Sequence, residues 1–509
     1  MHADPSNATR PPIHFATALP VHRDAAAAAA LVALGLLLFA AVWLGMLGAT
    51  SLVPPADNIE QLIWVRSLEW GYYKHPPLPT WLMWLPARLF GLGAWTSYGL
   101  GAACTLGALW LLWRLLVTLR GTTYAGVALL AVLCITYYNG RLNYYNHNIV
   151  LLLFSTASAA LTWQAFATRR LRWWAALGLV LGLASLSKYQ CAVTASAVLA
   201  FAWRQRAWRD PVHRLGLLLA CLVALLVFAP HLAWLHEHDF GPVGYAIESS
   251  LGAHIDLGHR LGVSANWLAD QLFNRALPAL LLLALVGWEA IRRSRADLAQ
   301  RPLGDSAVRD LLLAWGIAPL CFMAAAGLLL GVDLQTQWGT AFLLFAVPAA
   351  MELTGHAVWR RADLGRAWRV FIIIQLLLLT LCWVTSPRGP AALQDHHWRA
   401  FDAAQFADRI AAPARAQLGG PIRIVVGRTS FAGALALQLP EHPLVLIDGR
   451  FDRSPWLGPS WLAQCGAVEI GAAGRLPGGR PVGGAFTDFD WRVLPPQPGA
   501  GPCPPLRSD

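Results

Sequence analysis

Asp57 and the basic and aromatic residues that follow it have the side-chain types needed for chemistry at a phosphate group. Residues 54–60 read PPADNIE, and residues 70–78 read WGYYKHPPL. A carboxylate near a cation is a candidate general base beside a phosphate site. An ordinary loop at a membrane surface, with charges that reach the water, would contain the same residue types. Both interpretations stay open at this point.

A second polar group, residues 137–148, reads YYNGRLNYYNHN. The amides and the imidazole of Asn146, His147 and Asn148 could hydrogen-bond sugar hydroxyls or hold a metal. Asparagine is also a good N-cap, and a helix is expected to begin near residue 148. Capping accounts for one asparagine and not for the whole cluster.

Lysine is rare in this chain. Of the 39 basic residues, only Lys74 and Lys188 are lysines, and the rest are arginines. A lysine kept against such a bias is a candidate for chemistry. Lys188 stands beside Tyr189, and an ammonium group at a membrane surface is a good point-charge partner for phosphate. The alternative is a lysine that only reaches from an apolar segment to the water.

Two further polar segments are candidates with weaker signals. Residues 230–240 read PHLAWLHEHDF, and residues 236–239 could form a metal site, although adjacent side chains rarely converge on one ion. Residues 333–338 read DLQTQW and could contribute Gln337 or Trp338 to a sugar pocket.

All of these segments lie between long apolar runs. The 509 residues are 56% hydrophobic and 13% charged, with a mean hydropathy of +0.47, whereas soluble domains have about 25% charged residues. This composition indicates an integral membrane protein. The net charge of +11 does not indicate nucleic-acid binding, because the arginines cluster in short loops, as in the cytoplasmic loops of membrane proteins.

Eleven membrane-spanning helices are predicted, since a span needs roughly 20 apolar residues. Residues 173–203 are too long for one ordinary span, and arginines flank them on both sides. The positive-inside rule places both flanks in the cytoplasm, so this stretch is interpreted as a hairpin whose tip, near Lys188, faces outward. The nine other spans are 25–50, 96–118, 121–138, 148–167, 214–232, 270–291, 311–331, 338–357 and 368–385.

The predicted fold is a polytopic α-helical membrane protein with a small C-terminal α/β domain. Residues 1–24 are expected to be cytoplasmic, residues 25–385 to form the transmembrane domain, and residues 386–509 to lie outside. Apolar runs predict three buried strands in the outer domain, at 422–426, 444–447 and 467–470. The expected outer loops are 51–95, 139–147, 233–266 and 332–337.

Six of the eight cysteines lie in or beside apolar runs and are expected to be small core residues. Cys465 and Cys503 lie in the C-terminal region instead. Nothing in their spacing recommends a disulfide, so the sequence leaves their pairing open.

These motifs, in this order, resemble the family 39-like glycosyltransferases of the GT-C superfamily. That group includes the protein O-mannosyltransferases and the bacterial aminoarabinose and lipopolysaccharide-core sugar transferases. The resemblance spans about residues 25–385. It rests on Asp57 with residues 70–78, then on residues 178–189 (GLVLGLASLSKY), 230–234 and 337–338.

The resemblance implies an enzyme of the bacterial inner membrane whose donor is a sugar on a polyprenyl phosphate, typically undecaprenyl. Asp57 would deprotonate or orient an acceptor hydroxyl, and attack at the anomeric carbon would displace the lipid phosphate with inversion. The acceptor would be an envelope lipid, glycan or protein at the periplasmic face. Lys74, His75 and Lys188 would offset the charge of the phosphate. The expected substrate-binding residues are Asn58, Tyr72, Tyr73, Asn146, His147, Asn148, Tyr189, Gln337 and Trp338.

Two positions depart from the pattern of this family. Many relatives have Asp-Glu where this chain has Asp57-Asn58, and many have an aspartate in the second outer loop, where this chain has residues 146–148. Without these carboxylates, which could bind a divalent metal, the sequence indicates no certain cofactor. A divalent metal in the site stays allowed but is disfavoured.

A transporter or lipid flippase is the main alternative function, and a non-catalytic envelope scaffold is another. Transporters often show internal repeats and polar groups at mid-membrane. This chain shows no convincing repeat, and its notable polar residues cluster in the outer loops. A scaffold would not need Asp57. The distribution of polar residues favours an enzyme at the membrane interface.

Overall fold

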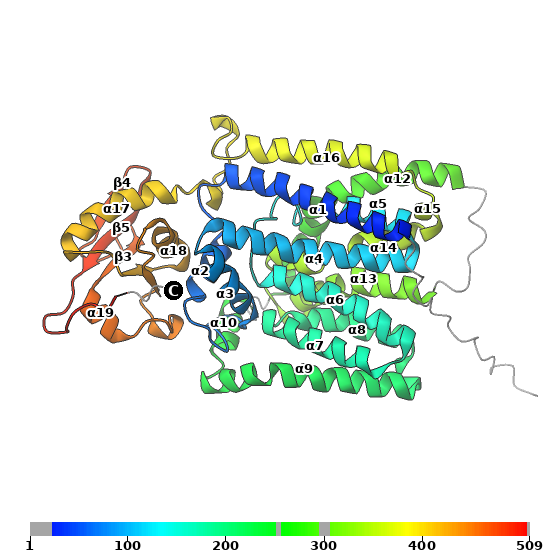
Figure 1. The fold of residues 1–509 in the computed structure, drawn as a ribbon, viewed down its shortest axis with the longest axis horizontal. Helices are drawn as coiled ribbons and strands as arrows, with labels where there is room; N and C mark the ends of the chain where they lie inside the picture. The colour runs from blue at the N-terminus through cyan, green and yellow to red at the C-terminus, as the bar shows by residue number, and fades with distance from the viewer. Residues whose placement is uncertain (1–22, 251–255, 295–305, 506–509) are drawn as a thin grey trace, which may run out of the picture.

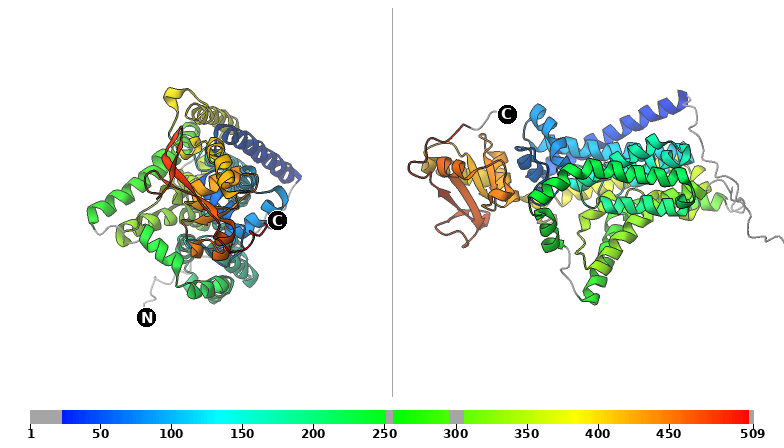
Figure 2. Two further views of the ribbon diagram at one scale, coloured as in Figure 1. Left: turned by 90° about the vertical axis from the view of Figure 1, so that its left-hand side faces the viewer. Right: turned by 90° about the horizontal axis from the view of Figure 1, so that it is seen from below.

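A helical bundle with an α/β unit at one end makes up the computed structural model (Figures 1 and 2). The structure describes residues 23–250, 256–294 and 306–505. The predicted cytoplasmic segment 1–24 lies almost entirely outside the described residues.

Six described helices are long and apolar enough to cross a membrane. An apolar helix satisfies its backbone groups internally, as a lipid environment requires. A bent pair with an angle of 58°, α11 and α12, is a seventh candidate span. The six helices are α1 (Arg23–Thr50), α4 (Ala94–Arg120), α6 (His147–Thr168), α9 (Pro211–Glu237), α13 (Ser306–Leu330) and α16 (Leu364–Val384).

Shorter elements fill the places of the other predicted spans. The expected hairpin 173–203 is a pair of apolar helices that breaks where the sequence predicts it, at Lys188. The predicted span 338–357 is not one helix, because it contains the end of η5, the whole of α14 and the start of α15. The shorter elements of the bundle are α5 (Thr122–Val132), α7 (Leu171–Ser187), α8 (Cys191–Arg204), η2 (Ala207–Arg209), α11 (Leu257–Ala269), η3 (Asp270–Arg275), α12 (Leu277–Ser294), η5 (Thr336–Ala341), α14 (Ala346–Thr354) and α15 (His356–Arg360).

Three short helices cap the end of the bundle that faces the α/β unit: α2 (Ala56–Trp64), α3 (Leu78–Phe90) and α10 (Gly241–Ser250) (Figure 1). The predicted outer loops are therefore partly helical. Pro55 is the N-cap of α2, and Pro77 is the N-cap of α3. Between these helices, Tyr72 and His75 exchange backbone hydrogen bonds of 3.0 and 3.2 Å. The tight turn that results presents Lys74 at its tip.

The second outer loop packs directly on α4. The backbone of Tyr144 lies so close to Gly101 that a Cβ atom at that position would overlap its carbonyl oxygen. Glycine lets two backbones approach in this way. The contact holds residues 139–147 against the bundle.

The C-terminal unit contains a five-stranded sheet with the strand order β2-β1-β3-β5-β4. The first three strands in this order are parallel, and the last two pair in the antiparallel sense. The three predicted strands correspond to β1, β2 and β3. The elements are η6 (Ala391–Leu393), η7 (Trp398–Ala400), α17 (Ala403–Leu418), β1 (Ile424–Gly427), α18 (Thr429–Gln438), β2 (Leu444–Ile447), η8 (Phe451–Arg453), α19 (Pro459–Cys465), β3 (Ala467–Ala472), β4 (Arg480–Gly483) and β5 (Phe486–Leu494).

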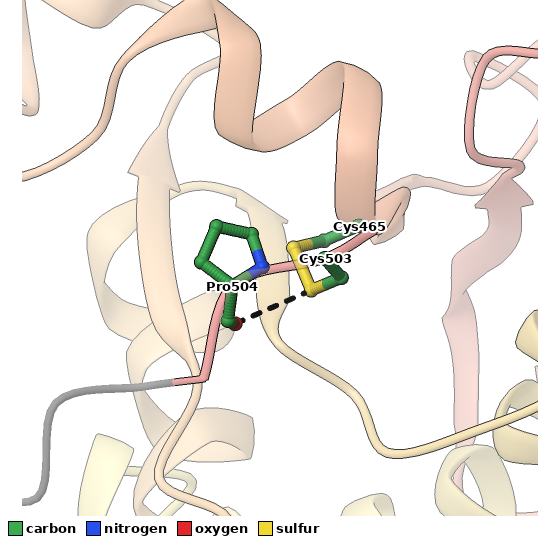
Figure 3. The surroundings of a disulfide bond; sticks show 3 residues. All are labelled: Cys465, Cys503 and Pro504. Atoms are coloured by element: carbon green, nitrogen blue, oxygen red, sulfur yellow. Dashed lines mark hydrogen bonds between the residues drawn. A yellow bond between two sulfur atoms is a disulfide. The ribbon is translucent and has the colours of Figure 1, made fainter. Parts of the chain in front are cut away.

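Cys465 and Cys503 form a disulfide in the structure (Figure 3). It joins the end of α19 to the C-terminal segment, 38 residues further along the chain. The other six cysteines are free, and three of them are buried in the bundle.

The C-terminal unit packs on the helix that carries Asp57. Gly433 of α18 lies against Ile59 and Ile63 of α2, and a Cβ atom at Gly433 would overlap both side chains. The indole of Trp398 donates a 2.7 Å hydrogen bond to the carbonyl of Pro54, just before α2. The C-terminal unit therefore helps to position Asp57.

We expect Gly433→Val to displace α18 from α2 and to lower the thermal stability of the purified protein, because overpacking of a tight contact costs about 1–3 kcal/mol. Gly420→Val is the matched control, since Gly420 has open space around its Cα. The melting temperatures of both variants in detergent would be compared with that of the wild type. An unchanged melting temperature of Gly433→Val would mean that this interface is not tightly packed.

Candidate functional site

One cavity, of about 590 Å³, collects most of the predicted site residues at the end of the bundle. They come from four separate segments: α2 and the turn after it, the start of α6, the break between α7 and α8, and η5. The predicted residues that line the cavity are Asp57, Lys74, His75, Asn146, His147, Asn148, Lys188, Tyr189, Gln337 and Trp338.

Asp57 is exposed at the cavity surface and is held in place by a helix cap. The side-chain amide of Asn146 donates a 2.8 Å hydrogen bond to Oδ2 of Asp57. The Oδ1 atom of Asn146 accepts from the backbone N–H groups of Asn148 and Ile149 at 3.0 and 3.1 Å. Asn146 thus caps α6, as the sequence allows, and also orients the carboxylate.

Lys74 forms an ion pair of 2.5 Å with Glu60. Burial favours the neutral form of Lys74, but the nearby Glu60 carboxylate outweighs this effect and raises the pKa of Lys74 above its ordinary value. Lys74 therefore carries a positive charge in the cavity. Its ammonium group also lies 5.6 Å from the ring centre of Tyr73 and 6.0 Å from that of Tyr245, close enough for cation–π attraction.

Lys188 is buried, with 7% of its surface exposed. Its Nζ atom donates a 2.7 Å hydrogen bond to Oδ1 of Asn148 and lies 5.4 Å from the ring centre of Trp338. Burial lowers the pKa of Lys188 to about 7, although the charge of Asp57 opposes the shift. The break between α7 and α8 is therefore not an exposed tip. It brings an ammonium group into the cavity.

The imidazoles of His75 and His147 lie beside each other, with ring centres 4.0 Å apart. Burial lowers the pKa of His75 well below its ordinary range, and the positive charges of neighbouring groups act in the same direction. His75 is therefore neutral near pH 7.

Glu60, His75 and His147 offer ligand atoms that all lie within 4.8 Å of one another, a spacing that suits a metal ion. The Lys74 ammonium already pairs with the Glu60 carboxylate. A divalent cation at this place would have to displace or repel that ammonium. The donor atoms fit a metal, but the charge of the surroundings opposes one.

Tyr189 connects the α7–α8 break to the first outer loop through His231 of α9. The Nδ1 atom of His231 lies 2.6 Å from the carbonyl oxygen of Trp70, and Nε2 lies 2.9 Å from the hydroxyl of Tyr189. A carbonyl oxygen only accepts, so Nδ1 donates and Nε2 accepts from Tyr189. This chain of hydrogen bonds ties together three of the segments that define the family resemblance.

Three predicted substrate-binding residues do not line the cavity. Asn58 is fully buried, and its amide donates to Ser97 Oγ at 2.9 Å and to the carbonyl of Asn143 at 2.8 Å. Tyr72 is buried, stacks on Trp64, and donates from its hydroxyl to a backbone carbonyl at 2.7 Å. Tyr73 is half-buried beside Lys74. These residues support the loops that carry the lining side chains.

The structure adds Glu60, Gln190 and Tyr245 to the cavity lining. Glu60 follows Asp57 by three residues, which places both on one face of α2, so helical spacing could have identified it. Tyr245 lies on α10, within a segment predicted as a loop, and only the tertiary fold brings it to the cavity. Residues 236–239, the weak metal candidate, are exposed and lie outside this cavity.

Comparisons with known proteins agree with the resemblance predicted from the loops. Residues 74–234 match the family model described as dolichyl-phosphate-mannose-protein mannosyltransferase. The lipid A galacturonosyltransferase RgtD of Rhizobium johnstonii (strain DSM 114642 / LMG 32736 / 3841) is 27% identical over 321 residues. That alignment covers 60% of this chain and 59% of the relative, so the chain spans less than two thirds of the relative's length.

Solved structures of ArnT from Cupriavidus metallidurans share the fold. The structure bound to undecaprenyl phosphate superposes with a TM-score of 0.61 at 16% identity, and the apo structure with a TM-score of 0.51 at 17% identity. Each comparison covers 91% of this chain and 98% of the other. The mainly helical chain thus shares the fold of the ArnT structures, and the family-model match and the relative agree with its predicted resemblance to the GT-C glycosyltransferases.

Proposed function

We propose that this protein is a glycosyltransferase that moves a sugar from a polyprenyl phosphate to an envelope acceptor, with inversion, at the periplasmic face of the bacterial inner membrane. The observation that carries the proposal is the composition of one cavity. Asp57, Lys74 and Lys188 line the polar end of this cavity. Side chains of α8 and α13 form its apolar wall.

The apolar wall suits the hydrocarbon chain of a lipid-linked donor. It includes Val193 of α8 and Phe322, Met323 and Leu330 of α13. Phe322 and Leu330 are 42% and 66% exposed on a helix that is apolar enough to span a membrane. A polyprenyl chain could therefore lie along α13 in the bilayer while its phosphate occupies the charged end.

In the proposed reaction, Asp57 acts on the acceptor and the two lysines act on the phosphate. The acceptor hydroxyl gives its proton to the Asp57 carboxylate as its oxygen bonds to the anomeric carbon. The bond between that carbon and the phosphate oxygen breaks, and its electron pair stays on the leaving polyprenyl phosphate. Lys74 and Lys188 offset the negative charge that develops there. Attack from the side opposite the phosphate inverts the configuration at the anomeric carbon.

The disulfide supports the proposed location of the C-terminal unit. Cys465 and Cys503 are paired, and such bonds persist in oxidising compartments such as the periplasm. The same unit packs on α2, so α2 and the cavity would face the periplasm as well. That side is where a flipped polyprenyl phosphate donor and an envelope acceptor could meet.

Asp57→Asn is expected to lower the rate of sugar transfer by about 10²–10⁴-fold, the typical contribution of a general base. Asp239→Asn is the control, because Asp239 is an exposed acid outside the cavity. Transfer would be measured from a panel of undecaprenyl-phosphate sugars to envelope lipids. Equal transfer by Asp57→Asn and wild type would remove Asp57 from the mechanism. No transfer by folded wild type from any donor would favour a transporter.

The affinity for undecaprenyl phosphate is expected to fall as the pH rises above about 7, where Lys188 loses its proton. The second pKa of the phosphate is about 6, so the phosphate is already mostly doubly ionised at about pH 7. A loss of affinity above neutral pH would therefore come from the protein. The arginine of a Lys188→Arg variant stays positively charged over this whole pH range. The affinity of that variant for undecaprenyl phosphate should therefore change less with pH. Binding at several pH values would test this. A profile that is equally steep in Lys188→Arg would exclude Lys188 as the titrating group.

We propose that transfer needs no divalent metal, because the ammonium of Lys74 already pairs with the Glu60 carboxylate. A chelator such as EDTA is then expected to leave the transfer rate unchanged. A loss of activity that added metal restores would contradict this. A His147→Gln variant that no longer responds to the metal would then assign the ion to Glu60, His75 and His147.

A further inference from the structure

A second cavity, of about 320 Å³, lies on the other side of the loops that carry Asp57. Pro55 lines this second cavity, whereas Asp57, two residues later, lines the donor cavity. In the same way, Tyr144 lines the second cavity and Asn146 lines the donor cavity. Residues 55–57 and 144–146 therefore form part of the wall between the two cavities, and Asp57 lies on the donor-cavity side of that wall.

Three guanidinium groups face the second cavity, from Arg141, Arg275 and Arg399. Two of them are paired with carboxylates: Arg275 with Asp270 at 3.1 Å, and Arg399 with Asp395 at 2.8 Å. Among the described lining residues Asp395 is the only carboxylate, and together with Asp270 it offsets two of the three arginines, so the charge of Arg141 remains in excess.

Arg141 has no carboxylate partner within the part of the chain that the structure describes. Its guanidinium lies 5.3 Å from the ring centre of Tyr144 and 5.7 Å from that of Tyr137. Contacts of this kind hold an arginine by cation–π attraction and leave its donors free to bind an anion. A guanidinium group matches the geometry of phosphate oxygens especially well.

The opposite part of the cavity is apolar and belongs to two helices of the bundle. Trp43 and Leu47 of α1 and Leu378 and Leu381 of α16 line it. These two helices lie side by side along the bundle (Figure 1), and their outer faces expose many leucines to the surroundings. An amphipathic molecule could enter this cavity sideways from the bilayer.

We propose that the second cavity is the acceptor site and that the acceptor is an anionic, phosphorylated membrane lipid. Its phosphate would bind Arg141 with Arg275 and Arg399, and its acyl chains would lie along α1 and α16. This inference rests on the proposed function and names the acceptor class of the same site. The lipid hydroxyl would extend past residues 55–57 into the donor cavity, give its proton to Asp57 there and bond to the anomeric carbon, as the bond from that carbon to the donor phosphate oxygen breaks.

Equilibrium binding of two lipids to the purified full-length protein in detergent would test the inference. The probes are bisphosphorylated lipid A, as the acceptor, and undecaprenyl phosphate, as the donor lipid. Dephosphorylated lipid A and inorganic phosphate separate the contributions of the phosphate and of the lipid. The variants are Arg141→Gln, Arg141→Lys and Lys188→Met. Arg388→Gln is the matched control, because Arg388 is exposed near the end of α16 but does not line the cavity.

Arg141→Gln is expected to weaken the binding of bisphosphorylated lipid A by roughly tenfold, the usual effect of losing one charge-assisted hydrogen bond. Arg141→Lys should restore part of this loss, and Arg388→Gln should bind as the wild type does. Neither variant of Arg141 should change the affinity for undecaprenyl phosphate. Lys188→Met should show the opposite pattern, with weaker binding of undecaprenyl phosphate and unchanged binding of lipid A.

Unchanged binding of bisphosphorylated lipid A to Arg141→Gln would overturn the inference, and so would equal losses for both lipids. If dephosphorylated lipid A binds as tightly as the phosphorylated form, the phosphate is not what is recognised. If inorganic phosphate alone competes at the concentration of the lipid, the site is a general anion site and not an acceptor site. Wild-type protein that does not bind undecaprenyl phosphate would instead contradict the proposed function.

Discussion

The burial of Lys188 and the partial burial of Lys74, beside the carboxylates of Asp57 and Glu60, is the constraint on which the rest of the site depends. Transfer of an isolated charge out of water is costly, and Lys188 is 93% buried by the surrounding chain, since only 7% of its surface is exposed. Asn148 and Asp57 offset part of this cost for Lys188, and Glu60 does so for Lys74. An anionic phosphate would offset the rest. The positive charge that the protein leaves uncompensated in the cavity is therefore complementary to the anionic donor that we propose.

Each of the loops that hold these charges is tied to a different part of the fold. Asn146 caps α6 and holds Asp57 at the same time. The hydrogen bonds of His231 join Tyr189 to the backbone of Trp70. The C-terminal unit presses on α2 through Gly433. A general base and its phosphate ligands need such positioning, because small displacements reduce catalysis strongly.

The same wall of residues that presents Asp57 to the donor cavity separates it from a second, arginine-lined cavity. The two lipid substrates that we propose would then approach Asp57 from different sides of the bundle. The donor cavity has its apolar wall on α8 and α13, and the second cavity has its apolar wall on α1 and α16. In our proposal, each hydrocarbon chain would have its own path into the bilayer, and only the reacting groups would come together.

The sequence by itself determined the long apolar helices, the break at Lys188 and the order of the loop motifs, because these follow from local composition and spacing. The family resemblance implied that Asn58 and Tyr72 bind substrate, yet both are buried and hold neighbouring segments in place. Only the tertiary structure decided which polar side chains share a cavity, which cysteines pair, and that residues 338–357 form no single helix. Those outcomes depend on contacts between segments far apart in the chain, and periodicity does not encode such contacts.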